Sequence, residues 1–279
     1  VAVVRGGSQS FAITPAAGYE IADVLVDGDS VGAVSSYTFS NVTKNHTITV
    51  SFDRTEEIAD PDETGVSGWL NTTDHTAYMQ GYPGNRFGPD DNMTRAEAAQ
   101  MFYNLLLDKD VAITVSFTDV EESAWYSRAV HVLASLGILE GVGGGLFAPE
   151  RSITRAEFTA IAMRFADLKT DGDNPFSDVY EDEWFYDVVV GSVRYGWING
   201  YPDGTFRPYD TIARAEAAAA TNRMLGRSAD RDYVDAHPGA LTRFDDVGTG
   251  YWAYYEIMEA ANAHDYTKDN GVEDWTRLQ

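Results

Sequence analysis

Three things are scarce or missing in this sequence, and each absence excludes a class of protein. The 279 residues include no cysteine, so disulfides and thiolate metal sites are excluded. No run approaches the roughly 20 consecutive apolar residues that a membrane-spanning helix needs, so we expect no membrane insertion. Basic residues number only 20 against 44 acidic ones, and the resulting net charge of −24 argues against a nucleic-acid partner.

What is present indicates a folded protein. Hydrophobic residues make up 44% and aromatic residues 13% of the chain, which is enough for packed cores. We expect most of the acidic side chains to form a solvated, repulsive surface. The lack of cysteine is typical of extracytoplasmic proteins of bacteria that build without disulfides. Because Val1 begins inside a β-like pattern, we expect a piece of a longer or processed polypeptide.

Residues 1–52 show the alternation of apolar and polar side chains that is typical of β-strands. The stretches "FAITP", "VLVDG", "SYTFSNV" and "HTITVSF" carry it, with Gly, Asp and Asn between them. The strands are too few for a sandwich, so we expect the module to be incomplete. It resembles small bacterial β repeat modules of surface proteins, through "GYEIADVLVDG" and "YTFSNVTKNHTITVSF", which implies a spacer role. Residues 53–65, "DRTEEIADPDETG", are predicted to form an acidic linker.

The remainder is repetitive. Arg-Ala-Glu occurs at residues 95–97, 155–157 and 214–216, at intervals of 60 and 59 residues. Phe-x-Asp-Val precedes the second and third copies, with a Trp eight residues after the Phe. An amphipathic segment that ends at glycine follows, and then a turn such as "GYPDGTFRP" at 200–208. Each full unit is therefore predicted to contain two helices joined by a turn.

The Arg-Ala-Glu box has the features of a helix start. Thr94 and Thr154 stand three residues before Glu97 and Glu157, which is the spacing of a capping box. The third copy has Ala213 instead of Thr, which should weaken that helix start by about 1 kcal/mol. Helix building does not explain the arginine, because a cation at the first helical position opposes the helix dipole. Two explanations stay open: an anion site at the helix N-terminus, or a buried Arg–Asp pair between repeats.

Phe-x-Asp-Val, the Trp, "GYPDGTFRP" and Ile-Thr-Arg-Ala-Glu, in this order, resemble the S-layer homology domain family. The resemblance covers residues 66–275 and implies a mainly α fold, with three repeats in a pseudo-threefold helical trimer. It implies non-covalent anchoring to an anionic, pyruvylated secondary polymer of the Gram-positive cell wall. In the family, the arginines of this box lie in grooves between repeats. Carried over, these are Arg95, Arg155 and Arg214.

The glycan site that we predict combines these arginines with aromatic and acidic residues of the Phe-x-Asp-Val segments. The tryptophans suit either stacking on sugar faces or packing in the core. The nine predicted glycan-binding residues are Arg95, Arg155, Arg214, Trp125, Trp184, Trp252, Asp119, Asp178 and Asp246. We expect no cofactor and no metal. The five histidines show no i, i+4 pair, and the calcium-like stretch 167–178 has Lys169 at a ligand position.

The first and last repeats are predicted to be complementary halves. Residues 244–264 carry Phe-x-Asp-Val, Trp252 and a helix, but no Arg-Ala-Glu box follows. Unit one, 66–107, has the box but no opening half. We therefore expect 244–264 to complete unit one by packing beside the Arg95 helix, with unit two at 115–168 and unit three at 174–227. The alternative is a fourth, decaying repeat attached to unit three.

The sequence thus predicts a surface-anchoring protein of the extracellular cell wall or S-layer: a β module at 1–52, a linker, and a wall-binding region at 66–279. The alternative function is a structural assembly unit whose repeats contact copies of the same protein within a surface lattice. We predict no enzyme, because the acids recur with the repeat and no nucleophile motif is present.

Overall fold

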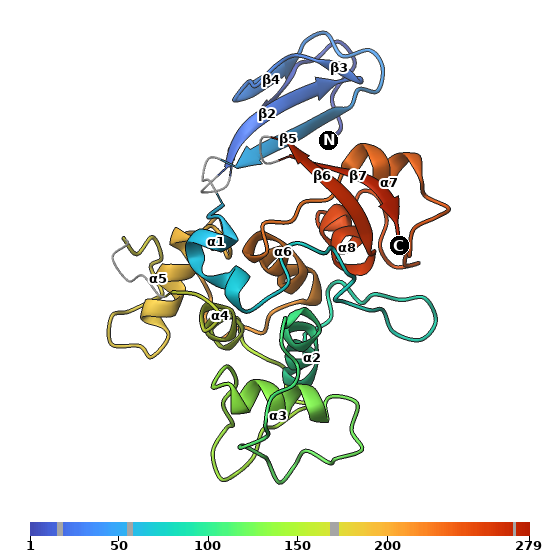
Figure 1. Cartoon of the computed structure of the whole chain (residues 1–279). Helices are drawn as coiled ribbons and strands as arrows, with labels where there is room; N and C mark the ends of the chain where they lie inside the picture. Colours follow the sequence, from blue (N-terminus) through green and yellow to red (C-terminus); the bar gives the residue numbers. More distant parts are fainter. Residues whose placement is uncertain (16–18, 55–57, 168–172, 270–271) are drawn as a thin grey trace. The chain divides into compact units, whose positions relative to one another are not determined.

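The computed structural model in Figure 1 describes residues 1–15, 19–54, 58–167, 173–269 and 272–279. The chain divides into two compact units. One contains Val1–Glu57 with Asn199–Phe206, and the other contains Ile58–Ile198 with Arg207–Gln279. Each unit is described by itself.

The first unit contains two small antiparallel sheets. Strand β1 (Gln9–Ala12) pairs with β4 (Ser36–Phe39), and β2 (Tyr19–Val26) lies between β3 (Asp29–Ser30) and β5 (Ile48–Arg54). Asp27 and Gly28 join β2 to β3 with φ angles of 53° and 95°, as a tight Asp-Gly hairpin requires. Strands are therefore present in all four stretches where alternation predicted them.

The second unit is built around three pairs of helices. Figure 1 shows α3 beside α2, α5 beside α4, and α8 beside α6. In each pair, the first member begins at Arg-Ala-Glu and the second follows a Phe-x-Asp-Val segment. The bounds are α2 (Arg95–Leu105), α3 (Ser127–Ser135), α4 (Arg155–Met163), α5 (Tyr186–Arg194), α6 (Arg214–Met224) and α8 (Tyr254–Ala261). The shorter elements are α1 (Pro61–Thr64), a 3-10 turn η1 (Val66–Gly68), α7 (Arg231–Ala236), β6 (His264–Asp269) and β7 (Val272–Leu278).

Capping boxes start the Arg-Ala-Glu helices, as the sequence predicts. The Thr94 hydroxyl accepts from the Glu97 amide at 3.2 Å, and the Glu97 carboxylate accepts from the Thr94 amide at 2.9 Å. α4 has the same pair of bonds. α6 begins at Ala213, which has no hydroxyl, so only the return bond from the Ala213 amide to Glu216 is made.

The three segments before these helices bond to one another in a closed ring. The amide of Ile153 donates to the carbonyl of Met93 at 2.9 Å, that of Ile212 donates to Ile153 at 3.1 Å, and that of Met93 donates to Ile212 at 3.0 Å. All three side chains are fully buried. We call this arrangement the loop ring. It fixes the three helix N-termini relative to one another.

The predicted fold class, mainly α, is wrong. Helices account for only 27% of the chain and strands for 17%, with eight helices and several small sheets. The physical reason lies in the repeat itself: its helices are only 9–11 residues long, and the segments between them are held by turns and side-chain bonds. Strands at both ends of the chain add to the β content, and only those in residues 1–52 were predicted.

The last repeat half contacts both unit three and unit one. Helix α8 packs against α6, so the expectation that it lies beside the Arg95 helix names the wrong helix partner. Ahead of α8, the ring of Phe244 packs on that of Phe87, with centroids 5.1 Å apart. At its end, the Ala260 carbonyl accepts from the amides of Tyr78 and Met79. Residues 244–264 thus reach the part of unit one that lacks an opening half.

The stretch expected to be a linker is partly structured. β5 extends to Arg54, and α1 begins at Pro61 with Asp60 as its cap. Thr64 is fully buried, and its carbonyl accepts from the Asp167 amide at 2.8 Å. Among the described residues, no helix has the length and apolarity to cross a membrane.

Candidate functional site

The arginines of the three boxes are buried, with exposed fractions of 5%, 3% and 4%. The side chain of Arg95 turns toward the next repeat, where its Nε donates to the Phe147 carbonyl at 2.8 Å and a terminal nitrogen donates to the Glu140 carbonyl at 2.6 Å. Arg214 makes the same bonds to the carbonyls of Phe87 and Gln80. Each of these two guanidinium groups therefore holds the turn of a neighbouring repeat.

The glutamates of the same boxes face these arginines in a cycle. The nearest N–O distances are 3.6 Å for Arg95–Glu157, 3.0 Å for Arg155–Glu216 and 3.5 Å for Arg214–Glu97. Each pair joins the first helical residue of one repeat to the third helical residue of the next. The hypothesis of an Arg–Asp pair is therefore wrong in its partner: these arginines pair with glutamate.

The helix N-termini do not offer free amides to an anion. In α2, the Arg95 amide donates to the Arg151 carbonyl at 2.9 Å, the Ala96 amide donates to the Pro149 carbonyl at 3.0 Å, and the Glu97 amide bonds to Thr94. α4 and α6 use carbonyls of neighbouring repeats in the same way. An anion site built on these amides is therefore excluded, because the loop ring occupies them.

The aspartates of Phe-x-Asp-Val clasp the turn between the two helices of a repeat. Asp119 accepts from the amides of Phe147 and Ala148 at 2.8 and 2.7 Å. Burial works to raise the pKa of Asp119, but these amide bonds outweigh it and hold the pKa below its ordinary value. Asp246 clasps Phe87 and Gly88 identically, with the same effect on its pKa, and Asp178 accepts from Arg207.

The tryptophans of the three segments lie at the surface. Trp125, Trp184 and Trp252 are 61%, 60% and 60% exposed. A core role for them is therefore wrong. An exposed indole in the same place of three repeats leaves a flat apolar face available to a ligand.

Two grooves lie between repeats. The Arg95 groove, of about 510 Å³, is lined by Arg95, Arg151, Glu157, Arg164 and Trp184 among others. The Arg214 groove, of about 430 Å³, is lined by Tyr82, Glu97, Asn104, Trp125 and Arg214 among others. The structure thus brings Arg95 together with Trp184, and Arg214 together with Trp125. Trp252, Asp119, Asp178 and Asp246 line neither groove.

Sequence reasoning missed Arg151 and Arg164, which lie on the walls of the Arg95 groove. Their side chains are 43% and 31% exposed, and Arg164 pairs with Glu140 at 2.8 Å. At the equivalent position of α2, nine residues after the box arginine, stands Asn104. Comparing the repeats position by position would have shown this difference in charge.

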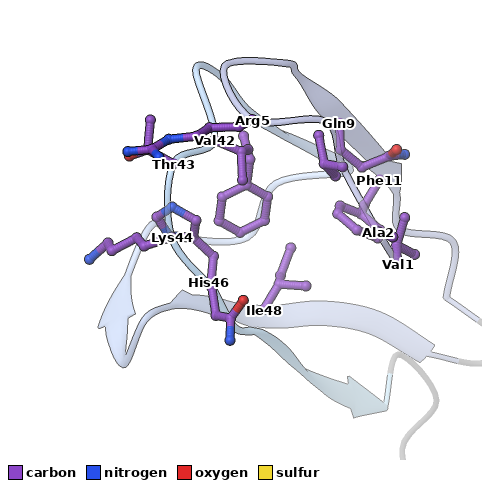
Figure 2. Close-up of a pocket in the computed structure, with 13 residues that line it drawn as sticks. Val1, Ala2, Arg5, Gln9, Phe11, Val42, Thr43, Lys44, His46 and Ile48 are labelled. Carbon is purple, nitrogen blue, oxygen red and sulfur yellow. The ribbon is translucent and has the colours of Figure 1, made fainter.

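A larger pocket of about 910 Å³ lies within the first unit (Figure 2). Phe11, Val42 and Ile48 form its apolar part, and His46 and Lys44 stand at its edge. None of its lining residues is Asp or Glu, so it offers no carboxylate pair for hydrolysis of a sugar bond.

The repeated grooves and the loop ring define the second unit as a repeat protein with binding surfaces between its repeats. Three of its segments, 77–99, 116–159 and 175–218, match the family model of the S-layer homology domain. These segments contain all three Arg-Ala-Glu boxes. The chain therefore carries S-layer homology domains.

Relatives extend the likeness. The Cellulosome-anchoring protein of Acetivibrio thermocellus is 37% identical over 213 residues, which are 72% of this chain and 46% of that protein. Cell surface glycoprotein 1 of the same species is 34% identical over 236 residues, which are 80% of this chain and 10% of that protein. The Amylopullulanase of Thermoanaerobacterium thermosulfurigenes is 36% identical over 157 residues, 54% of this chain and 8% of that protein. The match thus spans less than half the length of each of these relatives.

Proposed function

We propose that this chain anchors a bacterial surface protein non-covalently to the cell wall, by binding an anionic secondary cell-wall polysaccharide in the grooves between its repeats. The family match and the similarity to a Cellulosome-anchoring protein and a Cell surface glycoprotein support anchoring at the extracellular surface. Pyruvylated sugars are the acidic groups that we propose as ligands. The segment shared with the Amylopullulanase is 8% of that enzyme, which fits an attachment role without catalysis of its own.

The observation that carries the proposal is the exposed tryptophan at each groove. Trp184 stands in the Arg95 groove and Trp125 in the Arg214 groove, each about 60% exposed. An indole face matches the apolar face of a pyranose ring. Arg95 and Arg214 lie in the groove floors, and in this proposal their guanidinium groups complete the site beside the turns that they hold.

The charges favour the Arg95 groove for an acidic sugar. It is lined by Arg95, Arg151 and Arg164 against Glu140 and Glu157, whereas the Arg214 groove has one arginine and Glu97. In a protein of net charge −24, a local excess of positive charge is needed to attract an anion at close range. We therefore propose that the Arg95 groove binds the polymer more tightly.

The test is sedimentation of the chain with isolated cell-wall sacculi, before and after removal of the non-peptidoglycan polymer. Trp184→Ala should reduce binding without changing the melting temperature, since its side chain is largely exposed. Trp69→Ala is the matched control, because Trp69 is 40% exposed, contacts Phe165 and lines neither groove. Equal binding by both variants would contradict the tryptophan's role.

Arg164→Asn gives the Arg95 groove the residue of the other groove, and we expect a loss of affinity of roughly threefold to tenfold. Binding that persists after polymer removal would refute the proposed ligand. Self-association of the chain without polymer binding would instead support the assembly of copies within a surface lattice.

A further inference from the structure

Four side chains from distant parts of the second unit meet in one buried cluster. His75 lies in the loop after η1, Glu259 on α8, His264 at the start of β6 and Glu273 on β7. Their exposed fractions are at most 3%. One nitrogen or oxygen atom from each lies within 4.8 Å of all the others.

The distances within the cluster are those of atoms around a common centre. His75 Nδ1 lies 2.9 Å from His264 Nε2, 3.3 Å from Glu259 Oε1 and 3.5 Å from Glu273 Oε2. His264 Nε2 lies 3.5 Å from Glu259 Oε2. Ligands about 2.0–2.1 Å from a tetrahedral Zn²⁺ are separated from one another by about 3.3 Å. The four atoms thus already lie close to the corners of such a tetrahedron.

Surrounding groups orient both imidazoles. His264 Nδ1 lies 2.9 Å from the Asn262 carbonyl, which can only accept, so Nδ1 carries the proton and Nε2 presents a lone pair to the cluster. The ring of Trp275 stacks on His264 with centroids 3.7 Å apart, and Tyr266 stacks on His75 at 3.9 Å. These contacts prevent the rings from turning away.

The protein groups described here leave one member of the cluster without a hydrogen-bond partner. Both carboxylate oxygens of Glu259 are buried and lack one, although the residue is fully enclosed. Burial raises the pKa of Glu259 to about 7 and lowers that of His75 to about 4. An isolated buried carboxylate is costly, and coordination to a cation removes that cost.

The nearby cations are engaged elsewhere as well. Lys268 lies 3.3 Å from Glu273 Oε1 and donates to the Gly226 carbonyl, which leaves Glu273 Oε2 facing the cluster. Arg227 donates to the carbonyls of Asn71, Asp74 and Thr76. These two cations stabilise the cluster's negative charge from a distance, but they do not supply hydrogen bonds to Glu259.

We propose that His75 Nδ1, His264 Nε2, Glu259 and Glu273 bind one Zn²⁺ ion in a structural site. Two imidazoles favour a transition metal over Ca²⁺ or Mg²⁺, which prefer sets of oxygen ligands. All four ligand positions come from the protein, so the site is closed and has no place for a substrate. The ion joins residues 189 positions apart in a chain without cysteine. It ties the loop of unit one to α8 and to the C-terminal hairpin.

Metal content of the unmodified full chain provides the first test. After dialysis against Zn²⁺ and removal of excess ion, native mass spectrometry should show one zinc per chain. Substitution with Co²⁺ should give the visible bands of a tetrahedral centre. A chain that retains no zinc would overturn the proposal, and His75 Nδ1 would then donate directly to His264 Nε2.

Glu259→Gln separates metal binding from simple packing. Zn²⁺ should raise the melting midpoint of the parent over that in chelator by roughly 5–10 °C. In chelator, the variant should melt at or above the parent because a buried charge is gone, whereas Zn²⁺ should not raise its midpoint. His46→Gln, which removes a histidine of the first unit, should respond to Zn²⁺ like the parent. A variant that melts below the parent by the same amount in Zn²⁺ and in chelator would show a packing role only.

Discussion

Replacing Arg95 by alanine tests whether the box arginine holds the protein together. The guanidinium is 5% exposed, donates to the carbonyls of Phe147 and Glu140, and faces Glu157 at 3.6 Å. Alanine would leave both carbonyls of the neighbouring turn without this donor. It would also leave Glu157 with Arg151 as its remaining printed cationic partner.

The magnitude follows from these contacts. Removing one partner from a buried pair costs about 3–5 kcal/mol, and each hydrogen bond to a charged group contributes about 1.5–3 kcal/mol. Because Arg151 still pairs with Glu157 and water can enter the opened space, we expect the lower part of that range, about 3–4 kcal/mol. Arg151→Ala is the matched control: it has the same glutamate partner but is 43% exposed, so we expect a loss of about 0–1 kcal/mol.

Urea unfolding followed by tryptophan fluorescence measures the difference. All six tryptophans belong to the second unit, so the signal reports its unfolding without contribution from the β module. The two variants should share the parent's slope and differ in midpoint. If Arg95→Ala unfolds at the same urea concentration as Arg151→Ala, the structural role of the arginine is refuted, and its burial serves another purpose.

Three further outcomes are expected in the second unit. Ala213→Thr should complete the missing capping box and raise the free energy of unfolding by about 1 kcal/mol, measured in urea; no gain would mean that the helix start is limited elsewhere. Because the folded-state pKa of Asp246 is lowered, its contribution to stability is present above pH of about 4 and is lost as pH falls through the folded pKa; acid unfolding of Asp246→Asn should therefore depend less steeply on pH below 4, and an unchanged profile would refute this. Ala148 holds a left-handed φ of 59° where unit one has Gly88, so Ala148→Gly should stabilise by up to about 1 kcal/mol in the same urea assay, and a destabilised variant would contradict the strain.

The features that the sequence predicted are those set by neighbours along the chain. The repeat interval, the caps at Thr94 and Thr154 and the strands of residues 1–52 each depend on a few adjacent residues. The fold class was wrong because the helices are short and the chain between them is held by side chains such as Asp119. The domain boundaries and the glycan contacts stay predictions.

The site could be predicted only in part, because its decisive contacts are distant in sequence. Arg95 reaches Phe147 across 52 residues, and Arg214 reaches Phe87 across 127. No periodicity indicates that an arginine at the first helical position turns inward. The pairing of His75 with His264 spans 189 residues and lies outside the repeat pattern altogether.

The loop ring also governs the order of assembly during folding. Its closing contact includes the bond from the Thr211 hydroxyl to Asn92, across 119 residues of chain. Contacts between such distant residues form slowly, so two repeats that have already paired expose the open backbone edges of Met93 and Ile153 until the third segment arrives. In a crowded solution, the third segment of another molecule fits those edges equally well. A geometry that makes the finished monomer self-contained therefore makes its unfinished form prone to exchange segments between molecules.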